Sequence, residues 1–565
     1  MIYNGELCSR SFKLQIVIGM VDYAKLAEQL IHAADDMRAE WDWYSAKIKP
    51  RAKEVLRHLE QPGAARGRAI SSVASEAVTI LANAHMNHIV APGIQWFKFK
   101  SPNYAASEKY LNWYANATEV SLDALARSNL YTELHSAVID RCLFGTGCML
   151  VEPGKTGGLR AHHIPIGTYG FSLSDEGRVD TLARSFKCTA WQAAQRFGEE
   201  RLPHEVRQAL ERDEERVTRL FEFWHLVAPR RSFHAGNLAS APDDMPFVSV
   251  YIYASGNRPI VEESGYAEFP YFVTRFLKWG DVLWGYPPGR PVIDDIISSI
   301  KLEKNLDFLS DLAAYPRVFI DASMRGEVDF RAGGVTVIPR EVAHLNLPRE
   351  WGSQARVDFA KDRIEAAEGR IRSAFYIPFL QMFSGVDREM TATEARARMA
   401  EQVIACSPTF SLFCDELSVL LERVFSILFR QGAYNTQKGS MPQDLVVPMG
   451  DGFHDELRTP RVTFHGRINR AIDEAQKSST DIAMASAAQY VQITGDPAAL
   501  DCINPDKLIR SAFEAAGAPS DIFRNEKEVE EVRAERRQQQ QAAMELQLAQ
   551  AANQSSQAVR NFERR

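Results

Sequence analysis

The sequence predicts an α+β fold that is mainly helical, and three observations support this class. Apolar residues recur at helical spacing over most of 22–144. Between 146 and 288, short runs of β-branched and aromatic residues alternate with turns, as they do in strands. From 291 onward the helical spacing returns. The 565 residues are 45% hydrophobic and 25% charged, which is ordinary globular composition and enough chain to bury several cores.

The first part is expected to contain three helices, each ended by a glycine or proline-glycine signal. In the first of them, Leu26, Leu30 and Met37 lie at helical spacing. The expected spans are 22–60 ending at Pro62-Gly63, about 68–90 ending at Pro92-Gly93, and about 105–144 ending at Gly145-Thr146-Gly147.

The middle part is expected to form strands. Each run is rich in residues that favour an extended backbone, and a short helix near 189–197 interrupts the series. The expected strands are 148–152, 220–227, 248–253 and 271–276.

A helix–β–helix run follows the strands. Helices are expected over 291–314 and 356–375, with short strands at 317–321 and 334–339 between them. A small module carried on two antiparallel helices leaves apolar stripes exposed unless something packs on them. Copies of the same chain could do so in a closed ring. An ordinary helical hairpin inside one core is the alternative.

Residues 376–390 are expected to form a loop before the last long helix. Thr391-Ala-Thr-Glu394 matches a capping box that opens a helix to about 432. The later half of this helix, 412–429, is apolar on nearly all sides and should be buried. Further expected segments are loop and strand over 435–465, helices over 468–524, and a charged, then Gln-rich, helix or disordered tail from 525.

Gly154-Lys155-Thr156 comes near to a phosphate loop but does not match one. The full pattern needs a glycine where Met149 stands, and a strand rather than a helix is expected after Gly157-Gly158. We therefore expect a hairpin turn here. Any energy conversion coupled to this protein would belong to another chain.

The sequence indicates no catalytic, cofactor or metal site. His85 and His88 lie three residues apart and His162-His163 are adjacent, but neither pair has cysteine or carboxylate partners at ligand spacing. No nucleophile elbow, HExxH or paired-carboxylate signature occurs. Seven cysteines without a CxxC motif indicate reduced thiols, and Cys142 and Cys148 are expected to be small buried side chains.

The N-terminal segment predicts neither a membrane span nor a signal peptide. Its most apolar stretch, Leu14–Val21, is far shorter than the ~20 residues that a span needs, and it lacks a small-residue cleavage pattern. Met20 is the expected start, because the helical pattern begins just after it. The formal net charge of −7 lacks the basic bias of a tight DNA binder and is compatible with a surface along which DNA slides.

Several segments, taken in order, resemble the head-to-tail connector, or portal, family of short-tailed bacteriophages over about 25–525. The segments are Ser128-Asn-Leu-Tyr131 with Phe144-Gly-Thr-Gly147, Pro270-Tyr-Phe-Val-Thr-Arg-Phe276 with Trp284-Gly-Tyr-Pro-Pro-Gly289, and Met390-Thr-Ala-Thr-Glu-Ala395. None is a catalytic signature. The resemblance implies a portal-type subunit with wing, stem, clip and crown regions, assembling into a dodecameric ring with a central channel.

The resemblance also implies a division of the chain. The parts would be an N-terminal extension (1–21), a wing (22–290 and 391–465), two stem helices (291–314 and 356–375), a clip (315–355), a channel loop (376–390), a crown (466–524) and a C-terminal helix, barrel or disordered tail (525–565).

Two groups of candidate site residues follow from this division. The DNA-facing residues of the channel loop would be Phe379, Met382, Phe383, Asp387, Arg388 and Glu389. Their mixed charges would not capture DNA, and their apolar members could act as a compressible gate. The clip residues that could meet the packaging motor and the tail would be Arg317, Arg325, Arg331 and Arg340. Both groups could instead be ordinary surface residues.

The implied function is a structural portal at the unique capsid vertex, through which DNA is packaged and ejected. The implied partners are further copies of the chain, double-stranded DNA without sequence preference, the terminase large subunit, a tail adaptor, and the scaffolding and major capsid proteins, with no membrane. The protein would be part of the virion after assembly in the host cytoplasm. Two alternatives remain: a virion scaffold or adaptor without an open channel, and a DNA-processing accessory enzyme.

Overall fold

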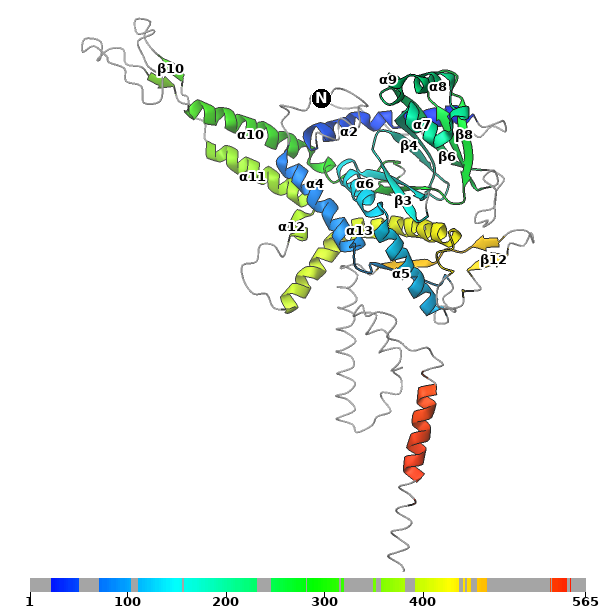
Figure 1. Ribbon diagram of the computed structural model, residues 1–565. Helices are drawn as coiled ribbons and strands as arrows, with labels where there is room; N and C mark the ends of the chain where they lie inside the picture. Colours follow the sequence, from blue (N-terminus) through cyan, green and yellow to red (C-terminus); the bar gives the residue numbers. More distant parts are fainter. Residues whose placement is uncertain are drawn as a thin grey trace, which may run out of the picture.

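The computed structural model describes a folded body from which a two-helix arm projects (Figure 1). The described residues are 22–49, 71–102, 110–154, 157–230, 245–280, 282–314, 317–319, 349–351, 357–381, 392–435, 441–442, 445–448, 455–464, 529, 531–545 and 549. None of the helices described has the length and hydropathy that crossing a bilayer requires.

The first expected helix is two helices. Helix α1 (Tyr23–Ala33) begins at the N-cap Asp22, whose carboxylate accepts the backbone N–H of Lys25, and α2 (Asp35–Lys47) follows after Ala34. The prediction of one helix over 22–60 is therefore wrong at Ala34. Its part beyond Ile48 falls largely outside the described residues.

The next two expected helices are present with internal changes. Helix α4 (Ser72–His85) continues as a π-helical turn η1 (Met86–Val90), which confirms the second span. The third span divides into α5 (Leu111–Arg127) and α6 (Leu130–Phe144). Helix α6 ends at Gly145 in the left-handed conformation, as the glycine signal predicts.

Two antiparallel sheets form the β-rich middle. The three-stranded sheet has the order β3-β2-β9, and the five-stranded sheet has the order β4-β5-β6-β7-β8. Their strands are β2 (Thr146–Pro153), β3 (Leu159–Ile164), β4 (Tyr169–Leu173), β5 (Val179–Thr189), β6 (Leu220–Pro229), β7 (Phe247–Tyr253), β8 (Ile260–Tyr266) and β9 (Tyr271–Arg275). The four expected strands are confirmed as β2, β6, β7 and β9.

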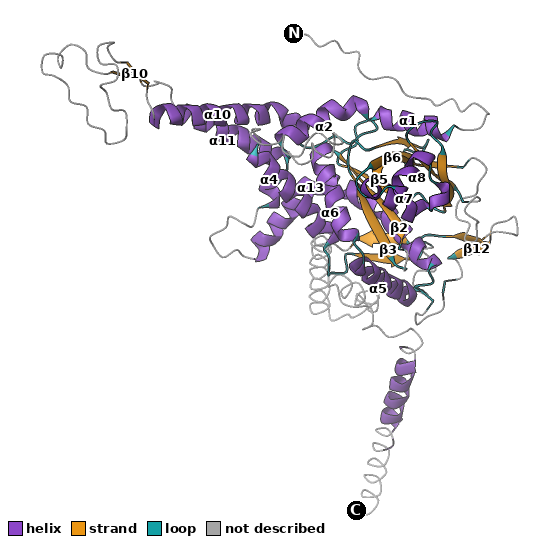
Figure 2. Cartoon of the chain, turned by 45° about the horizontal axis from the view of Figure 1, so that its top comes forward, coloured by secondary structure: helices purple, strands orange, loops and turns teal. Residues whose placement is uncertain are grey.

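Helices cover both faces of the five-stranded sheet. On one face, α7 (Ala190–Phe197) and α8 (His204–Glu211) pack their apolar residues against β6 and β7. On the other face, α1 buries Ala27 and Leu30 against the same strands (Figure 2). Helix α7 is the short helix that the sequence predicts, whereas α8, the 3₁₀ turn η3 (Glu199–Arg201) and α9 (Asp213–Arg216) were not expected.

The main core lies where α4, α5, α6 and the three-stranded sheet meet α13 (Ala392–Arg430). Helix α13 begins one residue after Thr391, and the expected burial over 412–429 is confirmed at most apolar positions, with Val419 56% exposed. Pro408 lies inside α13, and Figure 1 shows the helix changing direction along its length. A proline removes one backbone bond and kinks a helix in this way.

The remaining elements are small. Strand β1 (Phe97–Lys100) pairs antiparallel with β14 (Arg461–Phe464), and β12 (Val446–Pro448) pairs with β13 (Asp455–Leu457). Residues 531–545 are helical and exposed along almost their whole length, which matches the helical option for the tail. The expected helices over 468–524 lie outside the described residues.

Candidate functional site: the two-helix arm and its joint

Two helices form the arm. Helix α10 (Ile293–Ala314), preceded by the 3₁₀ turn η5 (Arg290–Val292), runs out from the body, and α11 (Val357–Ala374) returns beside it (Figures 1 and 2). At 1.5 Å per residue, α10 is about 33 Å long. At the far end β10 (Arg317–Phe319) pairs antiparallel with β11 (Arg349–Trp351). Both predicted helices are thus confirmed within two residues at each end.

The inner part of the arm is packed into the body. Ile296 of α10, and Ile371 and Phe375 at the end of α11, are buried in the main core. Helix α11 also contacts α4. Because fully buried side chains of this size each contribute roughly 1.5–3 kcal/mol, this root holds the arm to the body.

The outer part of the arm is more exposed than its root. Phe308 is 58% exposed on α10. Nearer the root, Arg370 of α11 donates to Asp295 of α10 at 2.6 Å, which fixes the antiparallel level of the two helices. Partial burial and the nearby charges of Glu368 and Asp307 raise the pKa of Glu303. Over the described residues, the outer arm is therefore a largely polar surface with an exposed aromatic ring.

A joint of three backbone segments lies between the body and the arm. An added Cβ at Gly145 would be 2.2 Å from the carbonyl oxygen of Gly285, and one at Gly285 would be 2.0 Å from that of Gly145. The backbone N–H of Phe276 donates to Gly145 O at 2.8 Å, and that of Gly285 donates to Thr146 Oγ1 at 2.8 Å. Only glycine permits this approach.

A buried arginine ties the same joint to α13. Arg141 is fully buried on α6; its Nη2 donates to Thr409 O at 3.0 Å, and its guanidinium lies 4.8 Å from the Phe413 ring centroid. Glu416 accepts from Thr274 Oγ1 at 2.6 Å and from the N–H of Arg275.

Burial lowers the pKa of Arg141 and raises that of Glu416, and each charge opposes the shift of the other. The two side chains form no ion pair within 4 Å, so this is a longer-range attraction, and Arg275 also favours the charge of Glu416.

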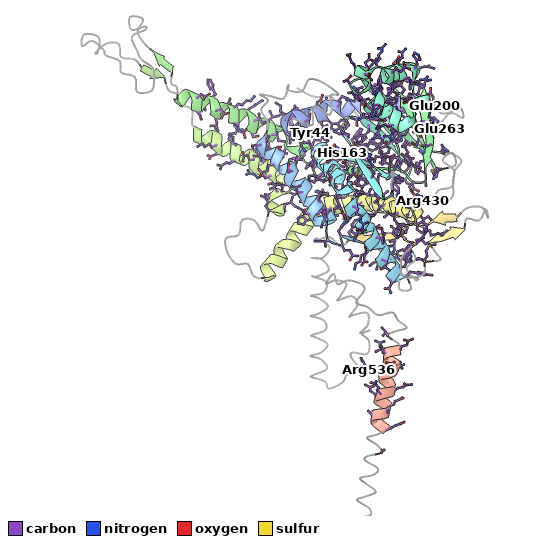
Figure 3. All side chains as sticks on the ribbon, in the orientation of Figure 1. Tyr44, His163, Glu200, Glu263, Arg430 and Arg536 are labelled. Carbon is purple, nitrogen blue, oxygen red and sulfur yellow. The ribbon has the colours of Figure 1, made fainter. Side chains whose placement is uncertain are left out.

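Aromatic packing extends the joint to the base of the arm. Trp284 lies edge-on to Trp41 at 4.7 Å and to Phe171 at 4.8 Å between ring centroids. Gly289 lies against Phe375 and Tyr44, the latter on α2 (Figure 3). The segments 144–147, 270–276 and 284–289, far apart in the sequence, thus meet in one place that sets where the arm begins.

The start of the expected channel loop is helical rather than a loop. Residues 377–380 form a helical turn, α12 (Ile377–Leu380), and Phe379 is half-buried against the main core. The loop prediction is therefore wrong at its first residues, because apolar side chains there anchor the chain to the core. Five of the candidate residues lie outside the described part of the chain: Met382, Phe383, Asp387, Arg388 and Glu389.

The expected clip residues are placed only in part. Arg317 begins β10 at the tip of the arm. Arg325, Arg331 and Arg340 lie outside the described residues, as does the strand expected at 334–339. The partner of β10 is β11, which the sequence did not predict.

The near-miss motifs have structural roles. The turn after β2 closes with the N–H of Gly157 donating to Gly154 O at 3.0 Å, so the hairpin is confirmed. His85 is fully buried, and its Nδ1 lies 2.9 Å from Leu81 O. Burial raises the pKa of the Cys142 thiol to about 12, so it is an inert buried group.

His163 of β3 pairs with a carboxylate of α6. Its Nε2 lies 2.8 Å from Asp140 Oδ2 of α6, and its backbone N–H donates to Glu133 (Figure 3 labels His163). Burial lowers the pKa of His163, but the hydrogen bond and charge of Asp140 outweigh burial and leave it raised. Over the described residues, no cluster of three metal-ligand side chains occurs.

Sequence reasoning missed Arg141 and Glu416. One signal was available: apart from Asp140, the neighbours of Arg141 between Ala137 and Phe144 are apolar. A charged residue in such a stretch needs a buried partner. Its partner, 275 residues away on α13, has no such signal.

Comparison with known proteins gives a consistent family. The profile of the bacteriophage head to tail connecting protein family matches residues 21–523. The chain is 25% identical over 551 residues to the portal protein of Salmonella phage epsilon15, covering 94% of each chain. It is 24% identical over 537 residues to the probable portal protein of Bordetella phage BPP-1, covering 92% of this chain and 91% of the other.

Solved structures also match this chain. The neck of a native GTA particle, computed with C12 symmetry, aligns with 60% of this chain and 86% of that chain, at 14% identity and a TM-score of 0.29. A TM-score of this size does not establish a shared fold.

Proposed function

This chain belongs to the bacteriophage head to tail connecting protein family, and from that membership we propose how it acts. It is a head-to-tail connector, or portal protein, with a structural role in the phage virion. We propose that its copies close into a ring, of about twelve subunits as the resemblance implies, at one capsid vertex. The ring is the conduit for double-stranded DNA during packaging and ejection.

The arm is the observation that supports the ring. Its root is buried and its joint is built from backbone contacts, so every copy places the arm in the same direction. Its outer part leaves Phe308 exposed, as expected for a surface that another copy covers. Identical copies that present the same directed element form a closed ring if the rotation between them closes.

Negative-stain imaging of the purified full-length chain tests the ring. We expect closed rings of about twelve subunits with a central hole. Light scattering alone is insufficient, because the rings could need scaffolding protein to form, so co-expression with the scaffolding protein of the same phage is included. Compact assemblies without a hole would favour the alternative of a virion scaffold or adaptor.

The segment after α12 is the proposed channel loop. Because Phe379 packs on the core, the DNA-facing part is narrowed to 382–390. Deleting 382–388 should leave ring assembly intact and impair retention of packaged DNA, whereas a deletion that begins at Phe379 should also destabilise the body. Particles with full genomes from the shorter deletion would contradict the gate.

The tip of the arm is the proposed docking site for the packaging motor and then the tail adaptor. Arg317 at the start of β10 and the arginines of 320–348 would contact these partners. Deleting 320–348 in a chain that still forms rings should abolish capture of the terminase large subunit. Unchanged capture would contradict the assignment.

A further inference from the structure

The outer face of α10 carries a regular stripe. Asp294, Ile297, Lys301, Lys304 and Phe308 follow one another at steps of three, four, three and four residues. This spacing places them on one side of the helix, as in a coiled-coil seam. Ile297 is half-buried and the other four side chains are exposed.

The outer face of α11 carries a stripe with the same spacing. It runs through Asp358, Asp362, Glu365, Gly369 and Arg372, and the last four of these residues are exposed. A Cβ added at Gly369 would have no neighbour within 4 Å, so the middle of this stripe is open. Two helix faces with matching steps are therefore left uncovered on one arm.

Neither stripe faces the other helix of its own arm. The side of α10 that meets α11 passes through Asp295, which binds Arg370, and through the half-buried Leu302 and Leu306. Lys304 lies nine residues, or about two and a half turns, from Asp295 and so points to the opposite side.

The charges of the two stripes are complementary at one antiparallel level. The contact between Asp295 and Arg370 shows which residues of the two helices lie at equal distance from the body. If that level is shifted by one residue, five pairs of positions lie opposite each other. They are Asp294 with Arg372, Ile297 with Gly369, Lys301 with Glu365, Lys304 with Asp362, and Phe308 with Asp358. All three pairs of charged side chains have opposite signs, and the apolar Ile297 meets the open Gly369.

The structure gives these charges little to bind within one chain. Within the described part of the chain, Asp294, Lys301, Lys304, Asp362 and Glu365 have no ion-pair partner. Arg372 contacts Glu368 at 3.2 Å, an exposed pair of the weak kind.

We infer that the outer face of α10 packs against the outer face of α11 of the next copy, antiparallel, with Lys301 and Lys304 opposite Glu365 and Asp362 and with Ile297 against Gly369. The inference rests on the proposed ring. Rotation about a ring axis roughly parallel to the arms keeps equal levels together, so the register within one arm carries over to the contact between arms. Phe308 then covers the first turn of α11 of the neighbour.

Two charge-reversal variants of the full-length chain test the contact. One carries Lys301→Glu with Lys304→Glu, and the other carries Asp362→Lys with Glu365→Lys. Each places like charges at two levels of every contact, and we expect subunit association to weaken about tenfold per contact. Native mass spectrometry should then show monomers where the wild type shows rings, while the melting temperature of the monomer is unchanged.

Mixing the two variants separates a contact between copies from one within a chain. In a ring where the variants alternate, every contact is again complementary, so an equal mixture should recover rings that contain both variants in equal amounts. A chain that carries all four substitutions should recover rings as well. Rings from either double variant alone at the wild-type yield, or recovery only with all four substitutions in one chain, would overturn the inference.

A cysteine pair tests the register directly. With Ile297→Cys and Gly369→Cys in one chain, mild oxidation should link subunits into a ladder on a non-reducing gel. Each single substitution is the control and should give no ladder. A linked ladder is expected only if the two faces meet at this level, so its absence from wild-type-like rings would contradict the inference. A wild-type chain that forms no rings, even with scaffolding protein, would instead overturn the proposed function.

Discussion

At the joint, Gly145 and Gly285 bring two backbones closer than any side chain allows, whereas on the arm Phe308 is 58% exposed and Gly369 has open space around it. The joint is held by buried groups from segments distant in sequence. The outer arm has half-buried leucines between its helices, and the ion pair of Asp295 with Arg370 lies closer to the root. We propose that the difference separates two tasks, with the joint setting the direction of the arm and the arm presenting a surface to other molecules.

Alanine at Gly285 and at Gly369 tests this difference most strongly. At Gly285 the new Cβ would meet a backbone carbonyl at 2.0 Å, so we expect a loss of about 4 kcal/mol in the free energy of unfolding. At Gly369 the same substitution meets nothing in a helix and should stabilise by roughly 0.5–1 kcal/mol. Chemical denaturation of the two variants checks the signs; equal effects would erase the contrast.

Removing the buried arginine is the next largest expected effect. Arg141→Met removes the guanidinium's hydrogen bonds to Thr409 O and Arg275 O and one of two positive charges that favour the Glu416 carboxylate, and we expect a loss of about 3 kcal/mol. The double variant with Glu416→Gln should lose less than the sum of the two single variants, because a neutral side chain there does not depend on the charge of Arg141. Thermal unfolding compared across the four proteins of this cycle measures the coupling. Additive losses would show that the two residues act separately.

The pair of His163 on β3 and Asp140 on α6 should make the free energy of unfolding depend on pH. The pKa of His163 is raised in the folded state, so its contribution is present below about pH 6.5 and is lost as pH rises through the folded pKa. His163→Gln should therefore cost about 1 kcal/mol more at pH 6 than at pH 9. Urea unfolding at both values checks this, and Asp140→Asn is the matched control, which should show the same loss of pH dependence.

The smallest expected effect is at the outer arm. Phe308→Ser should change the stability of the monomer by less than about 0.5 kcal/mol, because the phenyl side chain is mostly exposed. Ile371→Ala, at the buried root of the same arm, should cost about 2–3 kcal/mol. Similar values for the two variants would mean that the outer arm is packed as tightly as its root.

Much of the element order could be predicted because it depends on local patterns. The period of apolar residues predicted both arm helices and most of α13, and β-branched runs predicted β2, β6, β7 and β9. Helix α8 was missed because it is short and its apolar residues, Val206 and Ala209, are few. The break at Ala34 was missed because alanine carries no stop signal.

For the candidate site, too, local patterns could be predicted and packing contacts could not. The arm and its helical spacing are visible in the sequence, and so are the charges along α10 and α11. Phe379 belongs to the expected loop 376–390, yet it and the apolar residues around it pack on the core. Side-chain burial depends on what lies opposite, and local spacing does not contain that information.

The sequence by itself determined the helices, the strands and the glycines at the ends of elements, because backbone preferences and apolar periodicity act over a few residues. Only the tertiary structure decided that Gly145 meets Gly285, that the charge of Arg141 reaches Glu416, and that two charged stripes lie at equal levels on one arm. These are contacts between residues tens to hundreds of positions apart. They arise from how whole elements pack, and no local preference encodes them.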